Sequence, residues 1–66
     1  MKPLSPRQHD VAAAISRGLS NKAIAAELGL SLGTIKTHVA ETLDRLGVRS
    51  RVEVATLIVR GQVRRT

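Results

Sequence analysis

The sequence contains no cysteine, phenylalanine, tryptophan or tyrosine. Without thiols, the chain can form neither a disulfide nor a thiolate metal site, which is typical of proteins from a reducing compartment. The two histidines, His9 and His38, lie too far apart in the sequence to bind zinc from one helix. Binding modes that stack unpaired bases on aromatic rings depend mainly on Phe, Trp and Tyr, which this chain does not contain. Recognition of a nucleic-acid duplex is still open, and neither a metal nor a cofactor is expected.

Long apolar segments are missing as well, since the runs VAAAI and VATLIV are far shorter than the ~20 residues that span a bilayer. The N-terminus has no secretory signal. We therefore expect a soluble, cytoplasmic protein without membrane contact. We do not expect an enzyme, because no spacing brings a nucleophile, a base and an orienting acid together and no Gly-rich phosphate loop occurs.

Basic residues, in contrast, are abundant. The 66 residues are enough for a single small domain, 1–66, and carry 11 Lys and Arg against 5 Asp and Glu, a net charge of +6. This charge on a small surface favours a polyanionic partner such as nucleic acid. The alternative is that some of the cations serve solubility or stabilise helix C-termini, and the isoelectric point does not separate the two interpretations.

Serines and glycines recur at regular places and predict an all-α fold of four helices. Stretches with helical spacing are preceded by Ser5, Ser20, Ser31 and Ser50 and followed by Gly18, Gly29, Gly47 and Gly61. Serine accepts hydrogen bonds from the unpaired N–H groups at a helix start, and glycine adopts the left-handed conformation that ends a helix. The segments SPRQ and SRVE are capping boxes. The predicted helices cover about residues 6–17, 21–28, 32–46 and 51–60.

The apolar positions of the first three helices predict one common core. Its members are Val11, Ala14, Ile15, Leu19, Ile24, Ala25, Leu28, Leu32, Ile35, Val39, Leu43 and Leu46. Only residues 29–31 separate the second and third helices, and this short, glycine-containing segment is typical of a helix-turn-helix. The turn would hold helix 32–46 so that its polar face projects into solvent and fits a major groove. The alternative is a helical bundle with the same turn that binds no nucleic acid.

The outward face of helix 32–46 favours groove binding, because its first half is short or cationic and its acidic residues come later. That first half presents Gly33, Thr34, Lys36, Thr37 and Ala40. Phosphate contacts are predicted where helix N-termini and cations gather. The predicted contacts are Asn21, Lys22, Ser31, Thr34, His38, Arg45, Arg49, Ser50 and Arg51. Simple solvation is the alternative for Arg45, and packing against helix 21–28 is the alternative for His38.

Helix 51–60 has two apolar sides, although one domain can bury only one of them. The side with Val54, Leu57 and Ile58 is expected to pack inward. The opposite side leaves a small strip for the same helix of a second copy, formed by Val52, Thr56 and Val59. The alternative is that these are scattered surface residues without a role.

Three segments carry a resemblance to a known family. LSPRQHDV, GLSNKAIAAELGLSLGTIKTHV and LGVRSRVE resemble the LuxR-type helix-turn-helix domain of many bacterial two-component and quorum-sensing regulators, from Leu4 to about Gly61. The chain departs from the family pattern at Gln8 and Ala23, where Glu is usual, and at Arg45, where Lys is usual.

The resemblance implies a four-helix domain whose third helix enters the major groove and whose fourth helix takes part in dimerisation. Carried over by position, the base-contacting residues are Lys36, Thr37 and Ala40. Lysine can donate to guanine, and the other two can touch a thymine methyl group. A contact to phosphate alone, or none, is the alternative for Lys36.

We therefore predict sequence-specific binding of double-stranded DNA for transcriptional regulation, as a homodimer on an inverted or direct repeat. Family members usually carry an N-terminal receiver or ligand-binding domain, so the chain is expected to be a natural small protein or the C-terminal effector domain of a longer response regulator. Such a protein would be associated with the nucleoid, and RNA polymerase is a further candidate partner. The alternative is a promoter- and polymerase-binding module similar to region 4 of a sigma factor.

Overall fold

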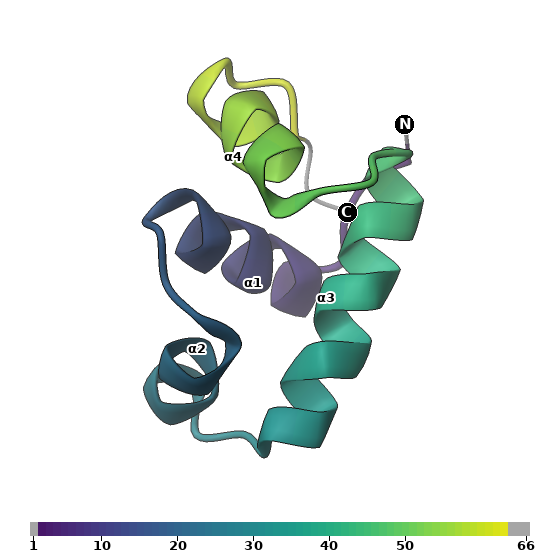
Figure 1. Cartoon of the computed structure of the whole chain (residues 1–66). Helices are drawn as coiled ribbons and strands as arrows, with labels where there is room; N and C mark the ends of the chain where they lie inside the picture. Colours follow the sequence, from purple (N-terminus) through teal and green to yellow (C-terminus); the bar gives the residue numbers. More distant parts are fainter. Residues whose placement is uncertain (1, 64–66) are drawn as a thin grey trace.

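The computed structural model describes residues 2–63 and contains four α-helices (Figure 1). They are α1 (Pro6–Ser16), α2 (Asn21–Leu28), α3 (Leu32–Leu46) and α4 (Arg51–Val59). The predicted all-α class is confirmed, and every predicted helix start agrees with the structure. The ends of α1 and α4 come one residue earlier than predicted, because Arg17 and Arg60 are the capping residues that follow these helices.

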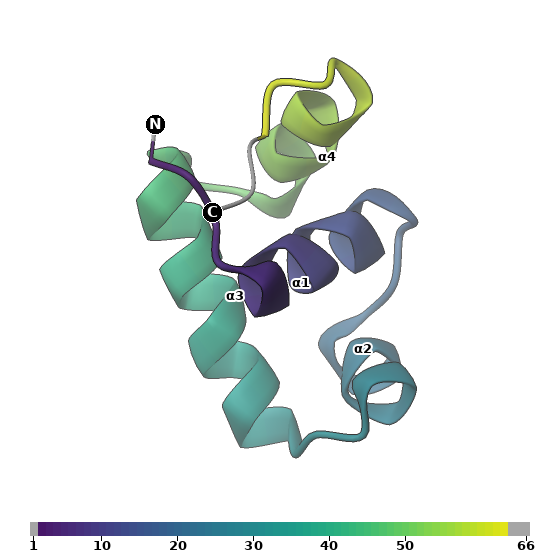
Figure 2. The same ribbon diagram turned by 180° about the vertical axis from the view of Figure 1, so that it is seen from behind.

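Helix α1 lies at the centre of the arrangement. It is placed between α2 and α4 and packs against all three other helices (Figures 1 and 2). Helix α3, the longest, runs along the side of this stack and also contacts each of the others. Among the described residues, α2 and α4 do not pack side by side, and a hydrogen bond from Arg51 to Asn21 joins their first residues. The two outer helices are therefore held in place mainly through α1 and α3.

The four helix starts have the predicted serine caps. The hydroxyl oxygens of Ser5, Ser20, Ser31 and Ser50 accept hydrogen bonds from the backbone N–H groups of Gln8, Ala23, Thr34 and Glu53. In α1 and α4 the third helical residue also bonds back to the backbone N–H of the serine, so both predicted capping boxes are present. Each such cap stabilises a helix by about 1 kcal/mol.

The predicted core is confirmed for most positions. The buried apolar residues are Leu4, Val11, Ala12, Ala14, Ile15, Ile24, Ala25, Ile35, Val39, Leu46 and Val54. Around them pack the partly buried Leu19, Leu28, Leu30, Leu43, Val48, Leu57, Ile58 and Val63. On α4, Val54 is fully buried whereas Val52 and Val59 are 75% and 80% exposed, so the predicted sidedness of this helix is correct.

The prediction for Leu32 is wrong, because its side chain is 44% exposed instead of facing the core. A helical side chain leans toward the preceding turn, and Leu32 is the first residue of α3. The Leu32 side chain therefore extends past the N-terminal end of α3, where no preceding turn covers it. The pattern also missed Leu4 and Thr42, which are fully buried. The Thr42 hydroxyl donates to the carbonyl of His38 at 2.7 Å, so this buried polar group is satisfied within the helix.

Candidate nucleic-acid interface

The turn between α2 and α3 is short and has a defined backbone. Gly29 has a φ of 68°, in the left-handed region, and the N–H of Leu30 donates to the carbonyl of Ala25 at 3.0 Å. An added Cβ at Gly29 would meet no atom within 4 Å, so glycine is favoured here by its backbone conformation and not by a lack of space. Buried Ile24 and Ile35 hold the two helices together on either side of the turn.

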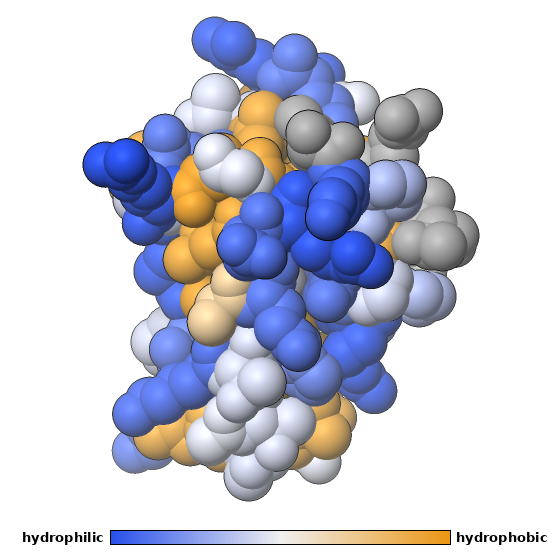
Figure 3. All heavy atoms as spheres, turned by 90° about the vertical axis from the view of Figure 1, so that its right-hand side faces the viewer, coloured by the Kyte–Doolittle hydropathy of each residue, from blue (hydrophilic) through white to orange (hydrophobic). Residues whose placement is uncertain are grey.

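The first half of α3 turns a smooth face outward. Gly33, Thr34, Lys36, Thr37 and Ala40 are all exposed, as predicted. Seen from the α3 side, the lower part of the molecule, where this helix begins, consists mainly of side chains of intermediate hydropathy flanked by hydrophobic ones (Figure 3). Small side chains of this kind allow a helix to approach a surface closely.

The start of α3 carries an ordered pair of hydroxyl groups. Ser31 accepts from the N–H of Thr34 at 3.1 Å and donates its own proton to the Thr34 hydroxyl oxygen at 2.8 Å. The Thr34 proton is then available to an acceptor outside the protein. The exposed N–H groups of the first turn lie beside it, at the positive end of the helix. Ser31 and Thr34 therefore form the kind of N-terminus that suits an anion such as a phosphate.

The three predicted base-contacting residues share this exposed face. Lys36 makes no hydrogen bond or ion pair with any residue of the described chain, so its ammonium group is available to a ligand. The Thr37 hydroxyl donates to the carbonyl of Gly33 at 3.2 Å, which favours contact through its methyl group. Ala40 presents a single methyl group on the next turn. The structure thus places Lys36, Thr37 and Ala40 together, and their roles stay predictions.

Several predicted phosphate contacts are already engaged within the protein. Ser50 caps α4, and the N–H groups of Arg49 and Ser50 donate to Glu53 at 2.8 and 3.0 Å. These two bonds lower the pKa of the Glu53 carboxyl below its ordinary value. Arg51 donates to Asn21 and to the carbonyl of Leu19. A phosphate can therefore bind only to those side-chain donors of these residues that make no hydrogen bond within the protein.

Two other predicted contacts lie away from the start of α3. Arg45 is 11 residues beyond Thr34, about 16 Å along the helix at its usual rise. It donates to Gln8 at 3.1 Å and borders a shallow hollow that is also lined by Glu41 and Asp44. His38 is only 26% exposed, and its buried Nδ1 makes no hydrogen bond and lies 3.6 Å from the Glu41 carboxylate. His38 is therefore mostly buried, and its role stays a prediction.

The structure also contains an ion pair that the sequence reading did not identify. Arg17 and Glu27 form two parallel hydrogen bonds of 2.9 Å, which join the end of α1 to α2. The hydrogen bonds from Arg17 lower the pKa of Glu27, and the pKa of Arg17 is raised in return. Both groups are solvent-exposed, so the pair contributes little stability.

Within residues 2–63, no group of three His, Asp or Glu side chains is arranged to hold a metal ion. In the same part of the chain, no helix has the length and apolar character needed to cross a membrane.

Comparison with known proteins identifies the family. Residues 2–58 match the family described as bacterial regulatory proteins, luxR family. The chain belongs to the LuxR family. The resemblance predicted from the sequence motifs is therefore confirmed, and it covers all four helices except the last residue of α4.

Relatives of this LuxR-family chain are named as regulators. UhpA of Salmonella typhimurium, a transcriptional regulatory protein, is 47% identical over 53 residues, which are 80% of this chain and 27% of UhpA. NarL of Escherichia coli, a nitrate/nitrite response regulator protein, is 40% identical over 55 residues, 83% of this chain and 26% of NarL. NarP of Escherichia coli is 43% identical over 56 residues, 85% of this chain and 26% of NarP. The chain thus spans about a quarter of the length of these relatives.

Proposed function

We propose that this LuxR-family domain binds double-stranded DNA with α3 in the major groove and thereby regulates transcription. The observation that carries the proposal is the exposed, small and cationic face on the first half of α3, backed by the buried Ile35 and Val39. A net charge of +6 supports it, because neutralising phosphates releases counterions. The names of the relatives, which describe transcriptional and response regulators, agree with it.

Base contacts are assigned to the face defined by Lys36, Thr37 and Ala40. Lys36 would donate to the O6 and N7 atoms of a guanine, and the two small side chains would touch thymine methyl groups. Contacts to the DNA backbone are assigned to the starts of α2 and α3, where exposed Lys22, Ser31 and Thr34 surround free helical N–H groups. This division separates residues that read sequence from residues that supply affinity.

Pairing of two copies is assigned to α4. The strip of Val52, Thr56 and Val59 is exposed on the side opposite the core. The Thr56 hydroxyl donates to the carbonyl of Val52 at 3.1 Å, so this residue also presents mainly its methyl group. Such a strip is too small for a stable dimer in solution, and we propose that the copies pair on DNA. Their α3 helices would then read half-sites about 34 Å apart, on an inverted or direct repeat.

The place of the domain in a larger protein is also a proposal. Because the chain spans about a quarter of UhpA and NarL, we propose that it acts as the DNA-binding effector part of a longer regulator associated with the nucleoid. RNA polymerase is proposed as a further partner. A module similar to region 4 of a sigma factor would use the α4 strip to dock on polymerase, whereas a LuxR-type dimer would use it for pairing.

Selection of bound duplexes from a random pool tests the proposal. We expect recovery of a motif repeated at a fixed spacing. Lys36→Ala should flatten the preference among recovered sequences, whereas Lys22→Ala should weaken binding to all of them about equally, because one residue reads bases and the other meets phosphate. The two variants remove the same charge and serve as matched controls. Identical effects would contradict base reading by Lys36, and a single unrepeated motif would contradict pairing.

A further inference from the structure

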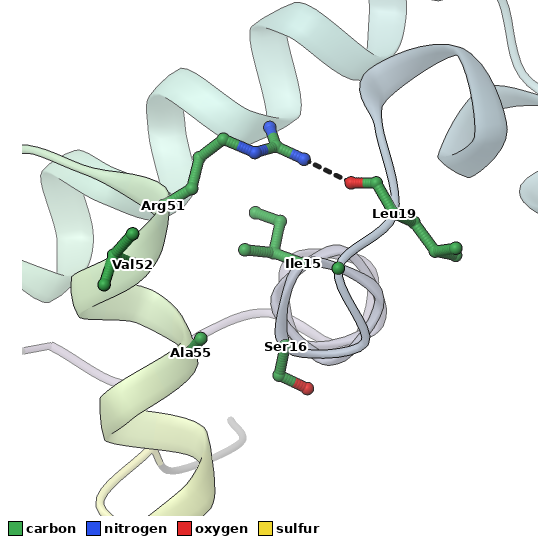
Figure 4. A pocket seen from close by; sticks show the side chains of 7 residues that line it. Ile15, Ser16, Leu19, Arg51, Val52 and Ala55 are labelled. Carbon is green, nitrogen blue, oxygen red and sulfur yellow. Dashed lines mark hydrogen bonds between the residues drawn. The ribbon is translucent and has the colours of Figure 1, made fainter.

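Arg51, the first residue of α4, reaches across the molecule to the segment before α2. Its Nη2 donates to the carbonyl of Leu19 at 2.6 Å, and its Nη1 donates to the Oδ1 of Asn21 at 2.6 Å (Figure 4 shows the first of these bonds). Asn21 is the first residue of α2. Both contacts are short, as expected for hydrogen bonds from a charged donor. We call this pair of contacts the Arg51 bridge.

The Arg51 bridge determines which atoms Asn21 can offer to a ligand. An asparagine side chain has one carbonyl oxygen, which accepts, and one NH₂ group, which donates twice. Because Oδ1 faces the guanidinium, the NH₂ group of Asn21 must face the other way. Asn21 is the first residue of α2, so this group belongs to the same helix end as the unpaired first N–H groups. A freely rotating amide would offer its acceptor oxygen to the same place about half of the time.

We infer that Arg51 is a positioning residue of the DNA interface, which acts by turning the donors of Asn21 toward a DNA phosphate. This inference rests on the proposed function, since it assumes that a phosphate lies at the start of α2. Arginine suits the task because its planar fork meets two acceptors at once, whereas lysine offers a single nitrogen. The bridge also joins the helix proposed for pairing, α4, to the helix proposed to contact the DNA backbone, α2.

A double-mutant cycle tests the inference. Duplex affinity is measured by fluorescence anisotropy for the wild type, Arg51→Lys, Asn21→Ala and the double variant, at one fixed salt concentration and well below the melting temperature of each. Arg51→Lys keeps the charge, so general attraction to DNA is unchanged. We expect Asn21→Ala to weaken binding about tenfold, the worth of one charge-assisted hydrogen bond. Arg51→Lys should weaken it only about twofold, because a freed amide still presents its donors about half of the time. The double variant should lose no more than Asn21→Ala alone.

Arg60→Lys is the matched control, because Arg60 is exposed and lies at the other end of α4. It should bind like the wild type. In the free protein, the Nδ2 proton signals of Asn21 in NMR spectra should shift in Arg51→Lys and stay in place in Arg60→Lys. A shift of this kind reports the orientation of the amide, which a change in stability alone would not alter.

Asn21→Asp adds a variant in which the bridge is kept, the donors are removed and a negative charge takes their place. A carboxylate still accepts from Arg51, so the melting temperature should be unchanged or higher, yet duplex affinity should fall. Wild-type affinity in Asn21→Asp would overturn the inference, as would unmoved Asn21 signals in Arg51→Lys. Independent losses, which would multiply to about twentyfold in the double variant, would overturn it too. If the wild type bound no duplex, the proposed function would fail and the inference with it.

Discussion

Replacement of Gly29 and Gly33 with alanine, in separate variants, tests how the turn is built. Gly29 has a φ of 68°, whereas Gly33 lies inside α3 without a positive φ. An added Cβ would meet no atom within 4 Å at either position, so packing does not distinguish the two. The backbone conformation should therefore decide the sign of each effect.

The expected changes in stability are opposite. An L-residue in the left-handed region costs about 1 to 2 kcal/mol, so Gly29→Ala should lower the free energy of unfolding by about that amount. Alanine inside a helix is better than glycine by about 0.5 to 1 kcal/mol, so Gly33→Ala should raise it. In a domain of this size, about 1 kcal/mol corresponds to a change in Tm of about 4 to 8 °C.

Thermal unfolding followed by far-ultraviolet circular dichroism measures both effects. The two variants add the same methyl group, so each is the control for the other. Shifts of the same sign would refute the argument that backbone conformation sets the outcome. A Tm for Gly29→Ala equal to that of the wild type would show that the left-handed backbone at this position does not require glycine. Gly33→Ala should in addition weaken duplex binding, because its methyl group adds bulk to the exposed face of α3.

Three further predictions concern the caps, the carboxylates and α4. Ser31→Ala and Ser20→Ala should each cost about 1 kcal/mol of stability. In gel-shift titrations, Ser31→Ala should weaken duplex binding more, because Ser31 orders the Thr34 hydroxyl at the start of α3. A larger loss of binding for Ser20→Ala would contradict this. Hydrogen bonds lower the pKa of Glu27 and Glu53 below the ordinary 4.5, so these groups stabilise the fold above pH 4.5 and the stabilisation is lost as the pH falls through their folded pKa values. Glu53→Gln should therefore show a smaller drop in Tm between neutral and acid pH than the wild type, and an equal drop would argue against the role of Glu53. Val59→Glu should change stability by less than about 0.5 kcal/mol, because the side chain is exposed, and should abolish cooperative binding to a repeat while single half-sites are still bound; retained cooperativity would exclude the strip as the pairing surface.

The features that could be predicted from the sequence depend on chemistry between residues three to five apart. A serine cap, a capping box or a left-handed glycine uses only neighbouring atoms, which is why all four helix starts were found. The sidedness of α3 and α4 follows from helical periodicity in the same way. Leu32 was misplaced because periodicity describes the middle of a helix and not its first residue.

The contacts between distant residues could not be predicted. The Arg51 bridge joins residues 30 and 32 positions apart, and the bond from Arg45 to Gln8 joins residues 37 apart. Each depends on how one helix is rotated against another, which the sequence pattern does not state. For the candidate site, the exposure of Lys36, Thr37 and Ala40 was predicted and is observed. Only the structure shows that Arg45 and Arg51 already donate hydrogen bonds to other residues of the chain.

The separation of the two faces of α3 has a consequence for how such domains diversify. Ile35, Val39 and Leu46 are buried on one face, while Lys36 and Thr37 on the other are exposed. Duplicated copies of a gene could therefore acquire new operator preferences through a few codon changes, because such changes leave the core and the free energy of unfolding nearly unaltered. A laboratory library randomised at those outward positions should likewise contain mostly folded members.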